Sequence, residues 1–168
     1  EEGRSRIVLD AISILKADAS SKVPIIGNLT GPISAAGSVL EPTTLYREMR
    51  RNPDAAHQLL QFVTEQLIRF ARAQAEAGAD VIAISDPSGT GEILGPKLFE
   101  QYAVRYLNQL LEGISDIAEG TIVHICGQMK QVYEQVDLIR SQALSFDSVV
   151  PMREARANLS RRILMGNV

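Results

Sequence analysis

Residues 121–127 read Thr-Ile-Val-His-Ile-Cys-Gly, an apolar, β-branched run that ends in His-x-Cys and a glycine. This composition favours a strand. Successive side chains of a strand point to opposite faces, so His124 and Cys126 share one face, with Cα atoms about 7 Å apart by strand rise. An imidazole and a thiolate held on one strand can bind one metal ion. Gly127 permits a sharp turn directly after them.

The same two residues also have an ordinary structural explanation. Cys126 is the only cysteine of the chain, and His57 is the only other histidine. A lone cysteine usually packs as a small hydrophobe, and a lone histidine is usually a hydrogen-bonded polar group. The place of the pair in the fold therefore decides between a metal site and packing.

A second strand is predicted at residues 80–86, where Asp-Val-Ile-Ala-Ile-Ser-Asp is almost continuously apolar. Such a run is typical of a parallel strand covered on both faces. A long helix precedes it, because Asn52-Pro53 is a helix start and Gly78 is a C-terminal cap.

Helices and strands alternate along the whole chain, and no hairpin signal interrupts them. A small-residue stretch at 33–40 leads into a predicted linker with Pro42. Residues 87–95 are predicted to be a glycine-rich loop, whose glycines lack dinucleotide-binding spacing. Helices are predicted at 4–18, 53–77, 96–113, 129–140 and 152–160, and strands at 23–28, 80–86, 121–126, 143–147 and 163–167.

This alternation predicts an α/β fold in which about five parallel strands are joined by crossover helices. We interpret residues 1–168 as a single domain, a partial (β/α)8 TIM barrel. Complete barrels need about 250 residues, so we expect a piece of a longer protein. Unpaired strand edges then predict self-association. An open, doubly wound five-stranded sheet is the competing architecture.

Each predicted strand ends on polar residues, namely Asn28, Asp86, His124 with Cys126, Asp147 and Asn167. In barrels and open parallel sheets, ligands bind at the carboxyl ends of the strands. Asp and Asn also favour loop starts for conformational reasons alone. Five successive polar strand ends around a metal-capable pair favour a functional site.

The composition argues against several classes of partner. A net charge of −3 offers no basic face for nucleic acid, and no apolar run approaches membrane-spanning length. One cysteine cannot form an intramolecular disulfide, which is typical of a cytoplasmic protein.

Five motifs together resemble the uroporphyrinogen decarboxylase superfamily. His-x-Cys is similar to the branch of zinc-dependent methyltransferases that move a methyl group from a methylcorrinoid protein to a thiol such as coenzyme M. The motifs, in chain order, are Ile-Gly-Asn-Leu-Thr-Gly-Pro at 26–32, Ile-Ser-Asp-Pro at 84–87, His-Ile-Cys-Gly at 124–127, Leu-Ser-Phe-Asp at 144–147 and Gly-Asn-Val at 166–168.

The resemblance implies a TIM barrel with zinc bound by His124 and Cys126, and a cysteine beyond Val168 as third ligand. Zinc would lower the pKa of the substrate thiol, which takes the methyl group from cobalt. We expect catalytic roles for Asp86 and Asp147 and substrate binding by Asn28 and Asn167, all orienting the thiol or the metal ligands. The methylcorrinoid would arrive on a partner protein.

Two alternatives stay open. Uroporphyrinogen decarboxylases use no metal and lack the His-x-Cys pair, so the metal separates that function from methyl transfer. A non-catalytic domain that binds a corrinoid protein is the third interpretation, and it would show neither metal nor turnover.

Overall fold

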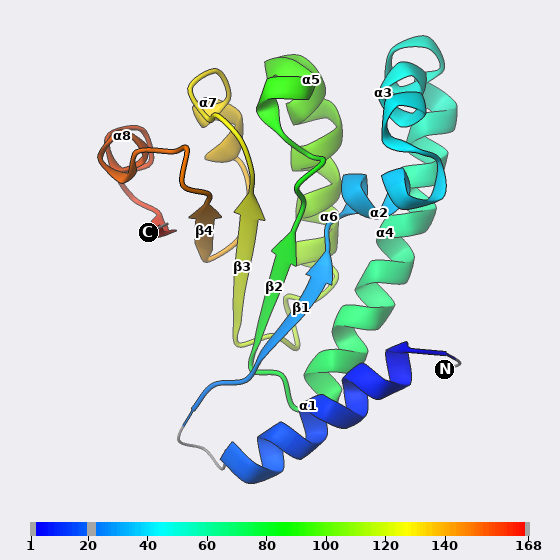
Figure 1. The fold of residues 1–168 in the computed structure, drawn as a ribbon, viewed down its shortest axis with the longest axis vertical. Helices are drawn as coiled ribbons and strands as arrows, with labels where there is room; N and C mark the ends of the chain where they lie inside the picture. Colours follow the sequence, from blue (N-terminus) through cyan, green and yellow to red (C-terminus); the bar gives the residue numbers. More distant parts are fainter. Residues whose placement is uncertain (1–2, 20–22, 167–168) are drawn as a thin grey trace.

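The structure, a computed structural model, describes residues 3–19 and 23–166. At its centre is a parallel five-stranded sheet in which each strand pairs with the next one along the chain (Figure 1). This order confirms the predicted parallel arrangement and has no reversal of the kind that a doubly wound sheet requires. The strands are β1 (Ile26–Thr30), β2 (Val81–Ser85), β3 (Gly120–Ile125), β4 (Ala143–Phe146) and β5 (Ile163–Met165).

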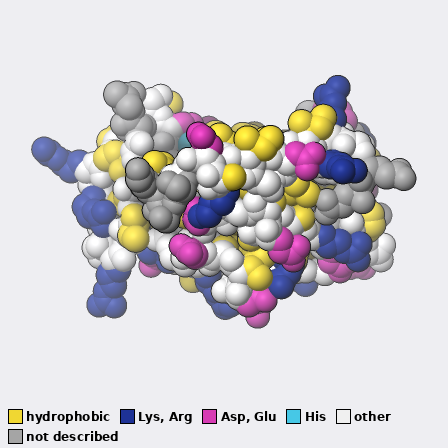
Figure 2. Space-filling view, turned by 90° about the horizontal axis from the view of Figure 1, so that it is seen from below, with side chains coloured by type: hydrophobic (Ala, Val, Ile, Leu, Met, Phe, Trp, Pro, Cys, Tyr) yellow, Lys and Arg dark blue, Asp and Glu magenta, His cyan; other side chains and the backbone are white. Residues whose placement is uncertain are grey.

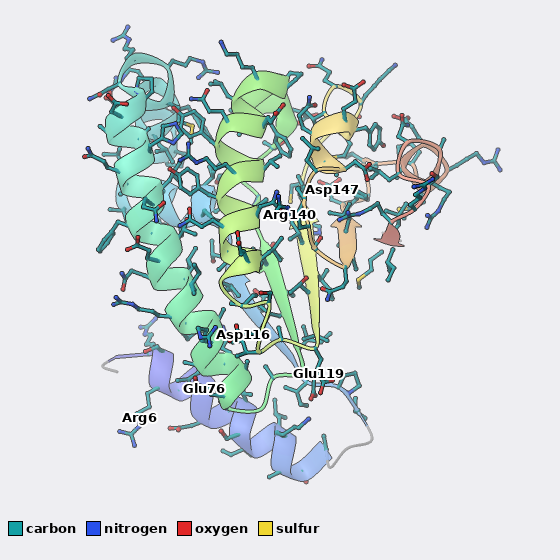
Figure 3. All side chains as sticks on the ribbon, turned by 180° about the vertical axis from the view of Figure 1, so that it is seen from behind. Arg6, Glu76, Asp116, Glu119, Arg140 and Asp147 are labelled. Atoms are coloured by element: carbon teal, nitrogen blue, oxygen red, sulfur yellow. The ribbon has the colours of Figure 1, made fainter. Side chains whose placement is uncertain are left out.

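Helices connect the strands, and the long helices between β1 and β2 and between β2 and β3 lie on one face of the sheet, as seen from behind in Figure 3. They are α1 (Ser5–Ala19), α2 (Pro32–Val39), α3 (Pro42–Arg51), α4 (Pro53–Glu76), α5 (Gly91–Leu98), the π-helix η2 (Phe99–Val104), α6 (Arg105–Glu112), α7 (Tyr133–Val136) and α8 (Met152–Asn158). The arrangement is that of part of a (β/α)8 barrel.

Burial alternates along the central strands because the two faces of the sheet differ. Ile82 and Ile84 of β2 are fully buried beneath the helices, as are Val123 and Ile125 of β3. The residues between them are partly exposed on the opposite face. We call this opposite face the inner face, because it corresponds to the interior of a barrel.

The long helix α4 begins and ends where the sequence predicts. Asn52 is the residue before Pro53, although its side chain makes no capping hydrogen bond. Gly78 follows the helix with φ +114°, a conformation that favours glycine. A Cβ at Gly78 would lie 2.8 Å from the Lys16 side chain, so glycine also lets α1 pack closely here.

The small-residue stretch at 33–40 forms most of α2, and the linker predicted with Pro42 is wrong, because α3 begins at Pro42. The N-terminus of α2 is capped by Asp86, the residue directly after β2. The Asp86 carboxylate accepts hydrogen bonds from the backbone amides of Ile33 (3.1 Å) and Ser34 (2.8 Å). Glu41 caps α3 by accepting hydrogen bonds from the Thr43 and Thr44 amides.

Two further boundaries differ from the prediction. Helix α5 begins inside the expected loop, capped by the Thr90 side chain, and a kink at Gly95 precedes Pro96. The helix expected over 129–140 is reduced to the single turn α7. Val132, the residue before this turn, packs against Gly91, where a Cβ would lie 2.4 Å from a valine methyl group.

Helix α1 crosses the end of the sheet where the strands begin. Asp80 binds the Lys16 ammonium and accepts a hydrogen bond from the Ile25 amide (2.8 Å), which fixes α1 against the starts of β1 and β2. Viewed from this end, acidic, basic and apolar side chains are interspersed (Figure 2). Within the described residues, no helix has the length and apolar character needed to span a membrane.

Candidate metal centre

His124 and Cys126 meet at the carboxyl end of β3, on the inner face. The Nε2 atom of His124 lies 3.3 Å from the Sγ atom of Cys126, and both side chains are half-buried. Strand alternation predicts this shared face, and the structure confirms it. Ile125, which stands between them in sequence, is fully buried on the opposite, helix-covered face.

The separation of these two atoms suits a zinc ion. Tetrahedral zinc with Zn–N near 2.0 Å and Zn–S near 2.3 Å places two such ligands about 3.6 Å apart. The observed 3.3 Å needs only a small adjustment of side-chain torsions. Within the described residues, no three His, Cys, Asp or Glu side chains gather into one metal-binding group. The third ligand beyond Val168 stays a prediction.

Without a metal, the surroundings of Cys126 favour the neutral thiol. Burial raises the pKa of Cys126, and the negative charges of Asp147 and Asp86 raise it further. A bound cation reverses this balance, since metal coordination deprotonates a thiol. The site is therefore one whose protonation state depends on whether a cation is present.

Ser145 is a member of the site that the sequence did not reveal. It pairs with His124 in the register of β3 and β4, and its Oγ lies 3.0 Å from the Nδ1 atom of His124. The sequence feature that could have indicated Ser145 is the Leu-Ser-Phe-Asp motif at 144–147, in which strand alternation places Ser145 and Asp147 on one face. The register that sets Ser145 beside His124 is visible only in the structure.

Asp147 fastens the loop that follows the metal-capable pair. Its Oδ2 accepts a hydrogen bond from the Gly127 amide (2.8 Å), and its Oδ1 accepts one from the Val149 amide (2.9 Å). The first bond joins the end of β4 to the residue directly after Cys126. Asp147 thus fixes the direction in which the chain leaves the site.

Asp86 lies apart from the inner face. Its side chain is fully buried and accepts hydrogen bonds from the Ser34 hydroxyl (2.6 Å) and from the amides at the start of α2. Burial raises its pKa, and these hydrogen bonds oppose that rise. Gly31 and Gly89 pack directly against the carboxyl group, where any Cβ would be too close. Asp86 therefore joins the loops after β1 and β2.

The two asparagines are placed differently. Asn28 is exposed and pairs in register with Ala83, so it lies two residues before the level of His124. Strand β1 continues past it to Thr30, which is aligned with Ser85 and, through Ser85, with His124. Asn167 lies outside the described residues.

A hollow of about 360 Å³ opens beside this end of β3, and its lining residues are Glu92, Gln128, Lys130 and Gln131. Gly127 borders this region, because a Cβ there would lie 2.9 Å from the Glu92 carboxylate. The hollow offers both a carboxylate and an ammonium group next to the metal-capable pair.

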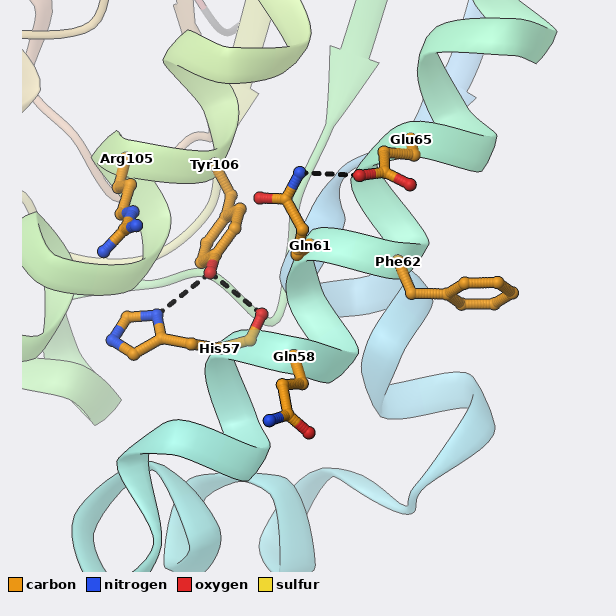
Figure 4. Close-up of a pocket in the computed structure, with 7 residues that line it drawn as sticks. All are labelled: His57, Gln58, Gln61, Phe62, Glu65, Arg105 and Tyr106. Atoms are coloured by element: carbon orange, nitrogen blue, oxygen red, sulfur yellow. Dashed lines mark hydrogen bonds between the residues drawn. The ribbon is translucent and has the colours of Figure 1, made fainter.

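A second hollow lies on the outer helices, between α4 and α6 (Figure 4). There the Tyr106 hydroxyl donates to the His57 carbonyl (3.0 Å) and lies 2.9 Å from His57 Nδ1. His57 is carried by α4 on the helical layer, whereas His124 is on the inner face of the sheet. The two histidines therefore belong to different environments.

The comparisons with known proteins agree with this fold. Residues 1–168 match the family described as uroporphyrinogen decarboxylase (URO-D). The chain belongs to the uroporphyrinogen decarboxylase family. Among solved structures, a methyltransferase from Methanosarcina mazei superimposes with a TM-score of 0.90 at 30% identity, over 99% of this chain and 49% of that one.

Sequence relatives within the family include methyltransferases and decarboxylases. Methylcobamide:CoM methyltransferase MtbA of Methanosarcina acetivorans is 30% identical over 99% of this chain and 49% of its own length. Uroporphyrinogen decarboxylase of Vibrio cholerae is 25% identical over similar shares. The chain thus spans about half the length of these curated relatives.

Proposed function

We propose that this chain is part of a zinc-dependent methyltransferase that moves a methyl group from a methylcorrinoid protein to a small thiol such as coenzyme M. The observation that carries the proposal is the 3.3 Å approach of His124 Nε2 to Cys126 Sγ at the carboxyl end of β3. The methyltransferase relatives at 30% identity support it. The single cysteine is consistent with a cytoplasmic protein.

His124 and Cys126 would hold the zinc, with a cysteine beyond Val168 as third ligand. Zinc bound there would lower the pKa of a substrate thiol, so that its sulfur takes the methyl group as the thiol proton leaves. Two protein groups on one strand form a rigid base, which is what an open catalytic zinc site needs.

The remaining predicted residues act as orienting groups in this proposal. Asp147 holds the amide of Gly127 and so sets the backbone that follows Cys126. Asp86, buried on the helix-covered side of the sheet, holds the loops after β1 and β2 together. Asn28 on the inner face and Asn167 are the proposed contacts for the substrate.

The methyl donor of the proposed reaction implies a partner protein. A corrinoid is bulky, so we propose that its carrier protein docks over the carboxyl ends of the strands. Glu92 and Lys130 line the hollow beside the loop that follows Cys126. They give the proposed docking region charge of both signs.

Decarboxylation of a porphyrinogen is the second candidate, because decarboxylase relatives match at 25–27% identity. The experiment that separates the two uses the full-length protein with methylcobalamin and coenzyme M, and in parallel with uroporphyrinogen. Methylation of the thiol with stoichiometric zinc supports the proposal. Metal-free protein that decarboxylates the porphyrinogen contradicts it.

The non-catalytic alternative is tested in the same preparation. A binding domain would retain a corrinoid protein in a pull-down while showing neither zinc nor turnover. Thiol methylation that depends on Cys126 excludes this alternative.

A further inference from the structure

Two serines flank His124 on the inner face, one on each neighbouring strand. The register pairs His124 with Ser85 of β2 and with Ser145 of β4. Only Ser145 engages the imidazole, with its Oγ 3.0 Å from Nδ1. Within the described residues, the Ser85 side chain makes no hydrogen bond. Of the two flanking serines, only Ser145 therefore holds the imidazole ring of His124.

The two ring nitrogens of His124 face different atoms, and this determines what each can do. Nδ1 faces an oxygen, and Nε2 faces the Cys126 sulfur at 3.3 Å. A neutral imidazole carries one proton, so one nitrogen donates and the other keeps its lone pair. Only the nitrogen with a lone pair can bind a metal.

The strength of the two acceptors decides where the proton lies. A serine oxygen is a good hydrogen-bond acceptor, whereas a cysteine sulfur is a weak one. The single N–H of the neutral ring is thus more stable on Nδ1, where it points at Ser145. The lone pair of Nε2 then points towards the sulfur of Cys126.

We propose that Ser145 is a positioning residue that holds His124 in the Nδ1–H tautomer and fixes the plane of its ring. The consequence for zinc rests on the proposed function. Hydrogen bonds to the second nitrogen of a metal-binding histidine are a common way to orient the ligand. Strand pairing supplies the rigidity, since Ser145 and His124 are register partners on adjacent strands.

The tautomer can be measured without any metal. We would label the 168-residue chain with ¹⁵N and record the ring nitrogen shifts of its two histidines at a pH where both rings are neutral. His57, remote on α4, reports whether each variant keeps its fold. In the unmodified chain, Nδ1 of His124 should show the shift of a protonated nitrogen and Nε2 that of an unprotonated one.

Three variants make this measurement specific. Ser145→Ala removes the acceptor, so the proton should redistribute towards Nε2. Ser145→Thr keeps a hydroxyl on a β-branched side chain suited to a strand, and should retain the original tautomer. Ser85→Ala, the matched control on the opposite flank, should leave the shifts unchanged.

The zinc affinity of the same variants, made in the full-length protein, gives an independent readout. Loss of such an orienting hydrogen bond typically weakens metal binding by about 10- to 100-fold. We expect this loss in Ser145→Ala, and affinity near the original in Ser145→Thr and Ser85→Ala.

Each outcome is decisive. A folded Ser145→Ala chain with the original tautomer overturns the proposal, as does a Ser145→Thr chain that loses it. If the tautomer follows the prediction but the full-length protein binds no zinc, the role of Ser145 stands and the proposed methyltransferase function fails.

Discussion

The Nε2 atom of His124 lies 3.3 Å from the Sγ atom of Cys126, although one residue separates them in sequence. The extended backbone at the end of β3 permits this approach, because it places alternate side chains on one face. The pair stands at the carboxyl end of a parallel strand, where barrels of this type bind their substrates.

Gly127 is predicted to be essential for the chain path after Cys126. Its φ is +81°, and a Cβ would lie 2.6 Å from the Thr90 hydroxyl oxygen and 2.9 Å from the Glu92 carboxylate. Gly127→Ala should lower the free energy of unfolding by about 2–3 kcal/mol, the sum of backbone strain and steric displacement. Urea denaturation measures the loss.

Gly95→Ala is the matched control for that prediction. Gly95 also has a positive φ, +68°, but a Cβ there would meet nothing within 4 Å. Its ψ of 168° lies in a region that only glycine adopts readily, so its substitution should cost about 2 kcal/mol, from backbone strain alone. Equal losses in the two variants would show that the close approach of Thr90 and Glu92 to Gly127 has no energetic effect.

His57 should make stability depend on pH. Desolvation by burial lowers the pKa of His57, with the Arg105 charge adding to this and Asp54 opposing it. The folded state therefore binds a proton less readily than the unfolded state. Stability is fully present above the unfolded pKa, near 6.5, and falls as the pH falls through the folded pKa.

The hydrogen bonds around His57 also favour its neutral ring and so agree with the lowered pKa. The Tyr106 hydroxyl donates to the His57 carbonyl, so it accepts from Nδ1, and the Gln101 amide nitrogen lies 3.3 Å from Nε2. A second ring proton would face an amide donor. His57→Gln should flatten the pH dependence of unfolding between about pH 7 and 5. An unchanged slope in this variant would assign the dependence to other groups.

The 168-residue chain is predicted to self-associate. In the described residues, β1 and β5 are paired on one side only, and Ile26 and Ile163 on them are 52% and 62% exposed. Unpaired edges with apolar side chains favour pairing between copies. Light scattering should show dimers or larger species that increase with concentration, and a monodisperse monomer at high concentration would contradict this.

The same chain is predicted to hold little zinc. Enzymatic zinc sites use three protein ligands, and His124 and Cys126 supply two. Asp147 is a harder donor than a thiolate, and it already binds the Gly127 and Val149 amides. Elemental analysis after dialysis against a mild chelator should find far less than one zinc per chain. Stoichiometric zinc would mean that the site is complete within residues 1–168.

The strands were predictable because their signal is local. The runs in β2 and β3 are apolar and bounded by polar residues and glycines, and both were placed within one residue of their observed starts. Alternation also sets His124 and Cys126 on one face. The same alternation places Asp86 with Ile82 and Ile84 on the helix-covered face. Strand alternation therefore separates Asp86 from the inner face, although its position at a strand end suggested a place in the site.

What the sequence missed depends on distant partners. Helix α2 is capped by Asp86, which lies more than fifty residues further along the chain. The region around α7 keeps only one helical turn, and Val132 before it packs against Gly91, about forty residues earlier in the chain. Ser145 joins the candidate site only through strand register. None of these relationships has a local sequence signature.

The most direct test of the central claim is the zinc content of the full-length protein purified without added metal, beside its Cys126→Ser and Ser85→Ala variants. If His124 and Cys126 hold the metal, the unmodified protein and Ser85→Ala contain about one zinc per chain, as expected for a catalytic site. Cys126→Ser then loses the metal while keeping its circular dichroism spectrum and cooperative unfolding. A Cys126→Ser protein with full zinc and full thiol methylation would show that Cys126 is only a packing residue.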